Sequence, residues 1–393
     1  MAKDKPYYPN ASIASIDILA KCLGVSPKVM LDLASKTESS YTEFLVSSKS
    51  KDRTVYEPKF ELKKLQKRIN ARIFAAVQFP GYLQGGIKDS DSPRDYVRNG
   101  KCHAGSNMLV SLDIRNFYDN IKRESVEDIF RNFFRFSPEV CSVLTDIVTL
   151  KGKVPQGACT SSYIANLVFH NTEYSVVSYL RSRGITYTRL LDDVTLSSKS
   201  ELSDEVLSEI IFKVSGMFKK HKLRIHPGKK KIEIAKDSRS EYKVTGVWVG
   251  HGVPKLRRKE RDYIRHLVYI CEQEYKKDPS VDSYHELWNR TSAHVATMTR
   301  MEHSQAVDLR ERMSKILPVF GVDRKTQVIV EANKLLRRDI SNNVRIGVIK
   351  TYNKTMHSLG ILSRTDRAAS RYYKRALRRK FSGVKTIQQF WEE

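Results

Sequence analysis

The sequence lacks the cysteine pattern of a disulfide-rich or zinc-binding protein, and it has no long apolar run. Its five cysteines are widely spaced, odd in number and without a C-x-x-C pair, which argues against both a disulfide framework and a zinc site. No segment approaches the ~20 apolar residues that a membrane span requires. The opening MAKDKPYYPN also lacks the apolar core of a signal peptide. We therefore expect a cytoplasmic protein that has no membrane partner.

Acidic residues are too few to balance the basic ones. The chain has 70 Lys and Arg against 44 Asp and Glu, which gives a formal net charge of +26 and a pI near 9.8. Solubility of a small domain needs a net charge of only about 2 to 8. Because cationic side chains that neutralise phosphates release condensed counterions, the excess favours nucleic acid over an anionic membrane as the partner.

The apolar periodicity of the 393 residues predicts an α+β protein with two or three subdomains. Strand and helix patterns alternate in the middle of the chain, and helical patterns dominate its C-terminal third. The predicted segments are a helical unit at 11–46 broken at Gly24 and Pro27, a basic strand before Pro58 and a helix after it, a strand at 108–114, helices at 116–134 and 161–180, two strands around an acidic turn at 187–198, helices from about 253 onward, and a basic amphipathic helix at 367–381.

Three aspartates lie at the ends of predicted strands. Asp113 closes an apolar strand, and Asp192 and Asp193 occupy the predicted hairpin turn. Carboxylate oxygens are ligands for Mg²⁺, and two such ions about 3.5–4 Å apart activate a 3′-hydroxyl and stabilise a leaving pyrophosphate. Because successive strand residues point to opposite faces, we rank Asp113 and Asp192 above Asp193 as ligands. The alternatives are a solvated turn and a helix cap.

A glycine turn precedes the hydroxyl-rich helix start within 154–168. The Gln156 amide can contact a nucleotide there, and Gly157 allows a close approach that a Cβ would block. The alternative is an ordinary helix cap by Thr160 or Ser161.

These segments resemble the motifs of reverse transcriptases and occur in the same order. LDIRNFYDNI resembles motif A, PQGACTSSYIANL resembles the Pro-Gln-Gly motif B, and YTRLLDDVTLSS resembles the Tyr-x-Asp-Asp motif C. RTVYEP with LKKLQKRIN is similar to the fingers motif, and LRIHPGKKKI is similar to the motif that follows the Asp pair. LAKCLGVS, NGKCH and the triplet at 244–246 are similar to features of the retron branch.

The resemblance implies a right-hand polymerase with fingers, an RRM-like palm with an antiparallel sheet, and a helical thumb. A basic helical extension follows the thumb. The implied divisions are an N-terminal helical region (1–50), fingers with a retron-like insert (51–105), the palm with further fingers segments (106–250), the thumb (251–318) and the C-terminal extension (319–393).

The resemblance also implies roles for single residues. The three aspartates would bind two Mg²⁺ ions, or Mn²⁺ in their place, and Lys229 would donate a proton to pyrophosphate. Arg53, Gln156 and Gly157 would bind the incoming deoxynucleotide. Tyr118 lies where the family has an aromatic ring under the sugar, which would collide with a ribose 2′-hydroxyl. The alternative for Tyr118 is a core aromatic.

Four positions depart from the family pattern. Leu190 and Leu191 replace the usual Tyr-Ala before the Asp pair, and Cys159 and Ser162 replace two prolines of motif B. The aspartates are unaffected, but the contact with the primer end becomes purely apolar. We therefore expect altered primer handling, fidelity and processivity, as in synthesis of a short or repetitive product or from an unusual primer.

Two further groups are candidates for contact with RNA. Asn99 and His103 lie in the retron-like insert, although a lone His is more often a structural residue. In the helix at 367–381, arginines can bind phosphates while tyrosines stack on bases; the alternative is a solvated basic face. The candidate residues of this helix are Tyr372, Arg375, Arg378 and Arg379.

We therefore predict RNA-templated DNA synthesis from dNTPs, with a dedicated non-coding RNA as template and primer scaffold, an RNA–DNA hybrid as product, and a role in antiphage defence. An effector protein or a second copy of the chain is a further candidate partner. The alternatives are a non-retron defence-associated reverse transcriptase that makes repetitive or unusually primed cDNA, an RNA-dependent RNA polymerase, and a non-catalytic RNA-binding scaffold. Tyr118 argues against the RNA polymerase, and the three carboxylates argue against the scaffold.

Overall fold

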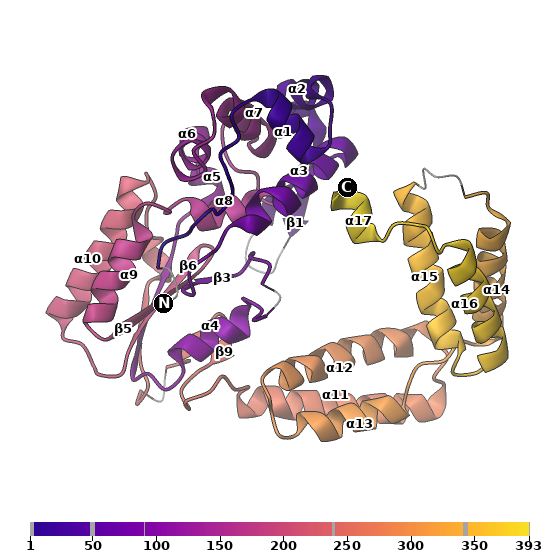
Figure 1. Cartoon of the computed structure of the whole chain (residues 1–393). Helices are drawn as coiled ribbons and strands as arrows, with labels where there is room; N and C mark the ends of the chain where they lie inside the picture. Colours follow the sequence, from indigo (N-terminus) through magenta and orange to yellow (C-terminus); the bar gives the residue numbers. More distant parts are fainter. Residues whose placement is uncertain (1–3, 48–51, 90, 238–239, 341–344, 393) are drawn as a thin grey trace. The chain divides into compact units, whose positions relative to one another are not determined.

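The computed structural model describes residues 4–47, 52–89, 91–237, 240–340 and 345–392 (Figure 1). The chain forms two compact units that divide after Pro254. The predicted boundary between residues 50 and 51 lies outside the described residues. Among the helices of the described part, none is long and apolar enough to cross a membrane.

The first unit is built on a five-stranded sheet with the strand order β3, β5, β6, β4, β7. Neighbouring strands are antiparallel except for β3 and β5. Strand β4 is buried along nearly its whole length, as its continuous apolar run predicts. The predicted strand at 108–114 and the hairpin at 187–198 are confirmed. The strands span Leu83–Gln84 (β3), Met108–Asp113 (β4), Ile185–Leu190 (β5), Asp193–Ser198 (β6) and Lys231–Ile234 (β7).

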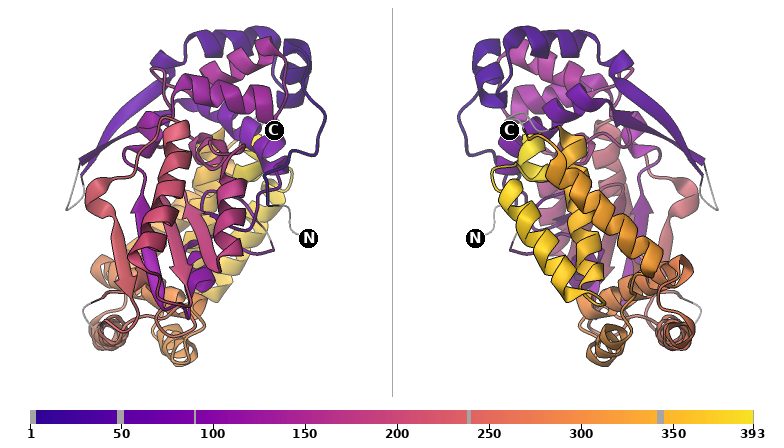
Figure 2. Two further views of the ribbon diagram at one scale, coloured as in Figure 1. Left: turned by 90° about the vertical axis from the view of Figure 1, so that its left-hand side faces the viewer. Right: turned by 90° about the vertical axis from the view of Figure 1, so that its right-hand side faces the viewer.

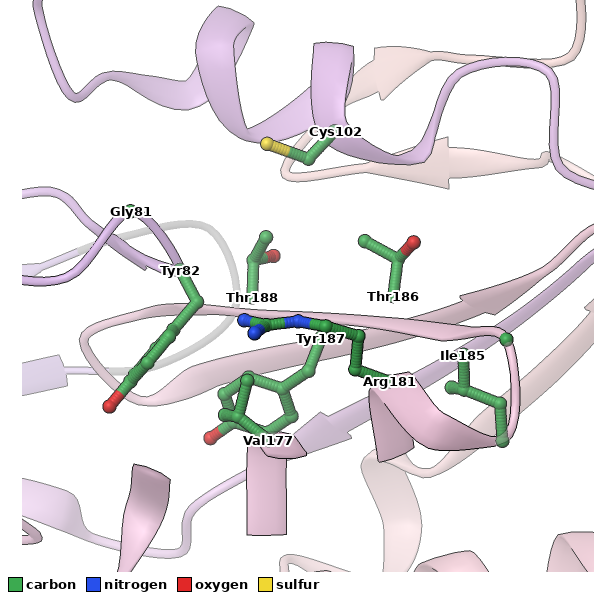
Figure 3. Close-up of a pocket in the computed structure, with 10 residues that line it drawn as sticks. Gly81, Tyr82, Cys102, Val177, Arg181, Ile185, Thr186, Tyr187 and Thr188 are labelled. Carbon is green, nitrogen blue, oxygen red and sulfur yellow. The ribbon is translucent and has the colours of Figure 1, made fainter. Parts of the chain in front are cut away.

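Helices cover both faces of this sheet. Successive residues of β5 point to opposite faces: Figure 3 shows Tyr187 directed toward Val177 and Thr188 toward the helix that carries Cys102. The first face is covered by two helices that lie side by side (Figure 2), and the second face by one. These helices are α9 (Glu173–Ser182) and α10 (Asp204–Lys220) on the first face and α4 (Tyr96–His103) on the second.

The N-terminal helices are interrupted where the sequence predicts. Gly24 adopts a left-handed φ of 63° after the first helix, and Pro27 occupies the first position of the second. The helix after Pro58 is also confirmed. The helices of this region are α1 (Ile16–Leu23), α2 (Pro27–Ser35), α3 (Phe60–Arg72) and α7 (Pro138–Val148).

The end of the segment predicted as helical at 11–46 is instead a strand. Strand β1 (Tyr41–Ser47) pairs along its whole length with β2 (Asp52–Pro58). Its aromatic and β-branched residues favour a strand. The hydrogen bonds that stabilise this strand come from β2, so residues 41–46 do not continue the helical pattern.

Two long predicted helices are each broken. The segment 116–134 forms α5 (Phe117–Asn120), α6 (Arg123–Asp128) and the π-helical η3 (Ile129–Phe133). It breaks at Ile121, whose carbonyl accepts a hydrogen bond from the Val154 N–H at 3.1 Å. This long-range bond replaces a helical one.

The predicted helix at 161–180 is α8 (Ser161–Leu167) followed by α9. The break includes Thr172, whose hydroxyl lies 2.8 Å from Nε2 of His221. A side-chain partner of this kind competes with the helical backbone. The remaining short elements of the first unit are η1 (Glu38–Ser40), η2 (Phe74–Ala76), η4 (Pro227–Lys229), β8 (Lys243–Val244) and β9 (Val247–Trp248).

The described part of the second unit consists of helices, as the sequence predicts from about residue 253. Two separate apolar cores hold them: the first ends at Ile316 and the second begins at Phe320. The predicted names and limits of the thumb and the extension remain predictions. The helices are α11 (Arg258–Lys277), α12 (Asp282–Arg300) and α13 (Ala306–Lys315) around the first core, α14 (Val322–Arg337), α15 (Ile346–Leu362) and α16 (Arg367–Lys380) around the second, and the short α17 (Ile387–Glu392).

Candidate active site

Strand pairing brings the three predicted aspartates together. Asp113, the last residue of β4, is paired with Asp193, the first residue of β6. Asp192 lies in the two-residue turn between β5 and β6, and its carbonyl accepts a hydrogen bond from the Ile114 N–H at 3.0 Å. The backbone therefore holds the ends of β4 and β6 and the turn against one another.

Burial and the neighbouring carboxylates raise the pKa of two of the three aspartates. Burial and the charges of Asp192 and Asp113 raise the pKa of Asp193 to about 6. Burial also raises the pKa of Asp192, and the nearby Asp113 adds to the effect. Several carboxylates that are held together in this way need cations to become fully ionised.

Lys229 supplies one such cation. It lies in η4, and its Nζ donates a hydrogen bond to Oδ2 of Asp113 at 2.6 Å. The lysine side chain is half exposed, whereas the Asp113 side chain is 12% exposed. A flexible, exposed ammonium can leave this carboxylate more easily than a buried one could.

The donor set fits a hard divalent cation, because all three aspartates offer oxygen ligands. Within the described residues, no group of three or more acidic, histidine or cysteine side chains is arranged to hold a metal ion. A cavity of about 440 Å³ nevertheless adjoins Asp113, Asp193 and Lys229, and it is also lined by Lys231 and Lys243. The site therefore has oxygen ligands, cationic side chains and space.

Two of the predicted nucleotide-binding residues lie near Asp192. The Arg53 guanidinium, on β2, lowers the pKa of Asp192, opposing the effect of burial. Tyr118, on α5, is half buried and hydrogen-bonds to Ser162; burial raises its pKa, and the nearby Asp192 adds to the effect. Ser162, one of the departures from the family pattern, therefore helps to hold the aromatic ring.

Gly157 has a different neighbour from the one that the sequence suggested. Its φ is +105°, and a Cβ there would lie 2.4 Å from Cγ1 of Val55 and 3.0 Å from the carbonyl oxygen of Tyr56. The close approach that requires glycine is that of strand β2. The adjacent Gln156 carbonyl accepts a hydrogen bond from the Tyr56 N–H at 2.8 Å. These contacts fix the loop against β2, and the Gln156 side chain is half buried.

The helix-cap alternative for this turn is not what the structure contains. The Thr160 side chain makes no capping hydrogen bond to α8, and the Ser161 hydroxyl donates to the Pro155 carbonyl at 2.6 Å. Cys159 is tied to α3 through its backbone, because its carbonyl accepts a hydrogen bond from the Asn70 side chain at 2.7 Å.

Residues 45–249, more than half of the chain, match the family model described as reverse transcriptase (RNA-dependent DNA polymerase). The retron Se72 reverse transcriptase of Salmonella heidelberg is 40% identical over 95% of this chain and 98% of the relative. The retron Ec48 reverse transcriptase of Escherichia coli is 32% identical over 93% of this chain and 92% of that relative. The chain belongs to the retron reverse transcriptases. It is an RNA-directed DNA polymerase with the right-hand polymerase fold, and it carries out RNA-templated DNA synthesis with a divalent metal.

A solved telomerase from Candida tropicalis aligns over 90% of this chain and 67% of its own, with 9% identity and a TM-score of 0.43. This similarity is too weak to add to the assignment of the enzyme to the retron reverse transcriptases, which depends on the sequence relatives.

Two residues of the retron-like insert are buried, so their predicted contact with RNA is wrong. Asn99 is 0% and His103 1% exposed. His103 hydrogen-bonds through Nδ1 to Ser197 and through Nε2 to Thr188, both at 2.7 Å, and the Thr188 hydroxyl donates to Asn99 at 2.6 Å. Burial lowers the pKa of His103 to about 3. In this retron reverse transcriptase, the pair ties α4 to β5 and β6.

The basic face of α16 is accessible, in contrast. Tyr372 is 66% exposed, and the three candidate arginines are also exposed, while Leu377 between them is buried in the second core. Tyr373 is half buried and its hydroxyl accepts a hydrogen bond from the Asn333 amide at 3.1 Å. RNA binding by this face of the retron reverse transcriptase remains a prediction.

The motif comparison did not identify Arg189, which is fully buried next to the turn that carries Asp192. Its position within YTRLLDD was the available signal, because an Arg on a buried strand needs a partner inside the protein.

Proposed function

We propose that the chain extends DNA on a dedicated non-coding RNA, in the cytoplasm, by two-metal nucleotidyl transfer at Asp113, Asp192 and Asp193. The pairing of Asp113 with Asp193, next to the turn that carries Asp192, is the observation that carries this proposal. Two Mg²⁺ ions, or Mn²⁺, would supply activation of the primer 3′-hydroxyl and neutralisation of the phosphates. The 3′-oxygen forms a bond to the α-phosphorus of a dNTP, and the bond to pyrophosphate breaks.

The other predicted site residues have complementary roles in this proposal. Arg53 and Gln156 hold the triphosphate and the base of the incoming nucleotide. Lys229, already within hydrogen-bonding distance of Asp113, donates a proton to the departing pyrophosphate. The Tyr118 ring, held by Ser162, excludes a ribose 2′-hydroxyl.

A double substitution tests the assignment of the site. In Asp192→Asn with Asp193→Asn, incorporation should fall by about 1000-fold or more, because several kcal/mol of charge stabilisation in the transition state is lost. The measurement is incorporation of each labelled nucleotide by the chain purified with its RNA, in the presence of Mg²⁺. The matched control is Asp308→Asn with Glu311→Gln, two acids of α13 that form ion pairs at the surface. Unchanged incorporation by the first variant would defeat the proposal.

The non-coding RNA is supported by the retron relatives and by the net charge of +26. The exposed residues of α16 are the proposed contact, with Arg side chains at phosphates and Tyr372 stacked on a base. Sequencing the RNA and DNA that copurify with the chain tests this. A 2′-5′-linked RNA–DNA chimera is expected, whereas a repetitive cDNA without such a link would indicate the non-retron type of product.

The proposed biological role is antiphage defence, with an effector protein or a second copy of the chain as partner. The resemblance to retron reverse transcriptases supports it. The test is the plating efficiency of phages on cells that carry the complete locus or the same locus with the Asp192, Asp193 double substitution. Equal plating efficiency on both kinds of cell would show that defence does not require DNA synthesis by this chain.

A further inference from the structure

Arg189 has a hydrogen-bond acceptor for each of its five N–H groups, although its side chain is 0% exposed. Two of these bonds go to the buried Glu173 carboxylate, from Nε at 2.6 Å and from Nη2 at 2.8 Å. The other three go to backbone carbonyl oxygens. These acceptors are Ala165 at 3.0 Å, Asn166 at 3.1 Å and Leu191 at 3.2 Å.

The bond to Leu191 reaches the peptide that immediately precedes Asp192. Leu191 has a φ of +59°, a conformation that residues other than glycine rarely adopt. The Leu191 carbonyl and the Asp192 N–H belong to the same planar peptide group. A hydrogen bond to that carbonyl oxygen therefore fixes the orientation of the peptide plane and, with it, the direction of the Asp192 side chain. Arg189 thus constrains a turn that the side chain of Leu191 disfavours.

The same guanidinium also holds the nucleotide side of the site. Ala165 and Asn166 lie in the last turn of α8. One turn earlier, α8 carries Ser162, which hydrogen-bonds to Tyr118. A single buried cation therefore connects the turn with the proposed metal ligand to the helix that supports the proposed sugar gate.

We propose that Arg189 is a positioning residue that sets the orientation of Asp192 relative to α8. The inference depends on the proposed role of Asp192 as a metal ligand. The competing explanation is that the Arg189–Glu173 pair is purely structural. A buried ion pair of that kind can be replaced by neutral groups with little loss of stability. The two explanations differ in whether metal binding changes.

Arg189→Lys is the first test, because lysine keeps the charge but cannot form the five-bond fork. We expect a fall in kcat of about 10- to 100-fold and a similar rise in the Mg²⁺ concentration for half-maximal activity, as for other groups that orient metal ligands. The second readout is Mn²⁺ binding by electron paramagnetic resonance without nucleotide, which should weaken by a similar factor. Arg68→Lys is the control, since this buried arginine binds the carbonyls of Leu23 and Gly24.

A second variant covers the outcome in which Arg189→Lys does not fold. Arg189→Met with Glu173→Gln removes both charges and leaves no ion unpaired, and it should show the same losses in kcat and Mn²⁺ binding. Normal Mg²⁺ dependence and Mn²⁺ binding in the folded variants would overturn the inference. Asp192→Asn separates the two proposals: full activity there overturns the proposed metal site, whereas inactivity there with normal Arg189 variants overturns only the positioning role.

Discussion

At the scale of single residues, Gly157 permits a close approach between the motif B loop and strand β2. Gly157→Ala should lower the free energy of unfolding by about 1–3 kcal/mol, because the new Cβ would overlap Val55 and the Tyr56 backbone. It should also raise the KM for dNTPs, since the loop carries Gln156. Urea denaturation and steady-state kinetics measure the two effects.

Gly152→Ala is the matched control for this change. Gly152 has a φ of +71° but no atom within 4 Å of the position of a Cβ. In Gly152→Ala, the fall in the free energy of unfolding should be limited to the cost of a left-handed φ, about 1 kcal/mol. If Gly157→Ala destabilises the protein no more than Gly152→Ala does, close contact with β2 is not what requires the glycine.

Tyr118 should determine the choice of sugar. Tyr118→Ala is expected to reduce the preference for dNTPs over ribonucleotides by about 5- to 30-fold, because removal of a steric clash of about 1–2 kcal/mol changes selectivity by that factor. Tyr118→Phe keeps the ring and should keep the preference, although it loses the bond to Ser162. Competition between labelled dGTP and GTP on one template gives the ratio. A preference that survives in Tyr118→Ala would favour the core-aromatic alternative.

At the scale of secondary-structure elements, buried hydrogen bonds from His103 hold α4 to β5 and β6. In the unfolded chain its pKa is near 6.5, and in the folded chain it is about 3. Above pH 6.5 the ring is neutral in both states and the stability is complete. As the pH falls from 6.5 toward 3, only the unfolded chain gains a proton, so the free energy of unfolding should fall by up to about 1.4 kcal/mol per pH unit.

A comparison with His103→Gln isolates this effect. The histidines whose pKa desolvation also lowers, His170, His221 and His303, are present in both proteins and contribute equally. Chemical denaturation at intervals between pH 7 and 4 should give a steeper loss for the unmodified chain than for the variant. Parallel curves would show that His103 takes up a proton without leaving its partners Thr188 and Ser197.

The exposed arginines of α16 should control the salt dependence of RNA binding. Changing the three candidate arginines to Gln should reduce the slope of log affinity against log salt by up to about 2, if each neutralises one phosphate of a single strand. The control is the same loss of charge from exposed lysines on α10, Lys213, Lys219 and Lys220. Filter binding of the copurified RNA at several salt concentrations measures the slope. Equal slopes for both triple variants would make α16 a solvated basic face.

Elements that depend on local sequence could be predicted, whereas those that depend on contacts with distant residues could not. Strand β4 and the β5–β6 hairpin were predictable because their apolar patterns and the acidic turn are local features. The break at Ile121 was not, because it depends on a hydrogen bond to Val154. Burial of Asn99 and His103 was likewise unpredictable, since their partners come from distant strands. The aspartates could be identified from residue type and motif order, whereas Arg189 required its contacts.

At the scale of the whole molecule, the proposed catalytic residues and the proposed RNA-binding helix belong to different compact units. The proposed catalytic residues all belong to the unit that ends at Pro254, while the candidate helix α16 belongs to the other. The sequence gives the net positive charge directly. The two separate cores of the second unit could not be predicted from it. Helical periodicity identifies an apolar stripe and does not specify which other helix it packs against.

The position of β4 between β6 and β7 has a consequence for the newly made chain. Asp113 is synthesised long before Asp193, so an emerging chain carries the first acid without its neighbours. The carboxylates repel one another, and only completed pairing of these distant strands forces them together. Polymerase activity should therefore be absent from shorter nascent chains and appear only after β6 has left the ribosome and paired with β4.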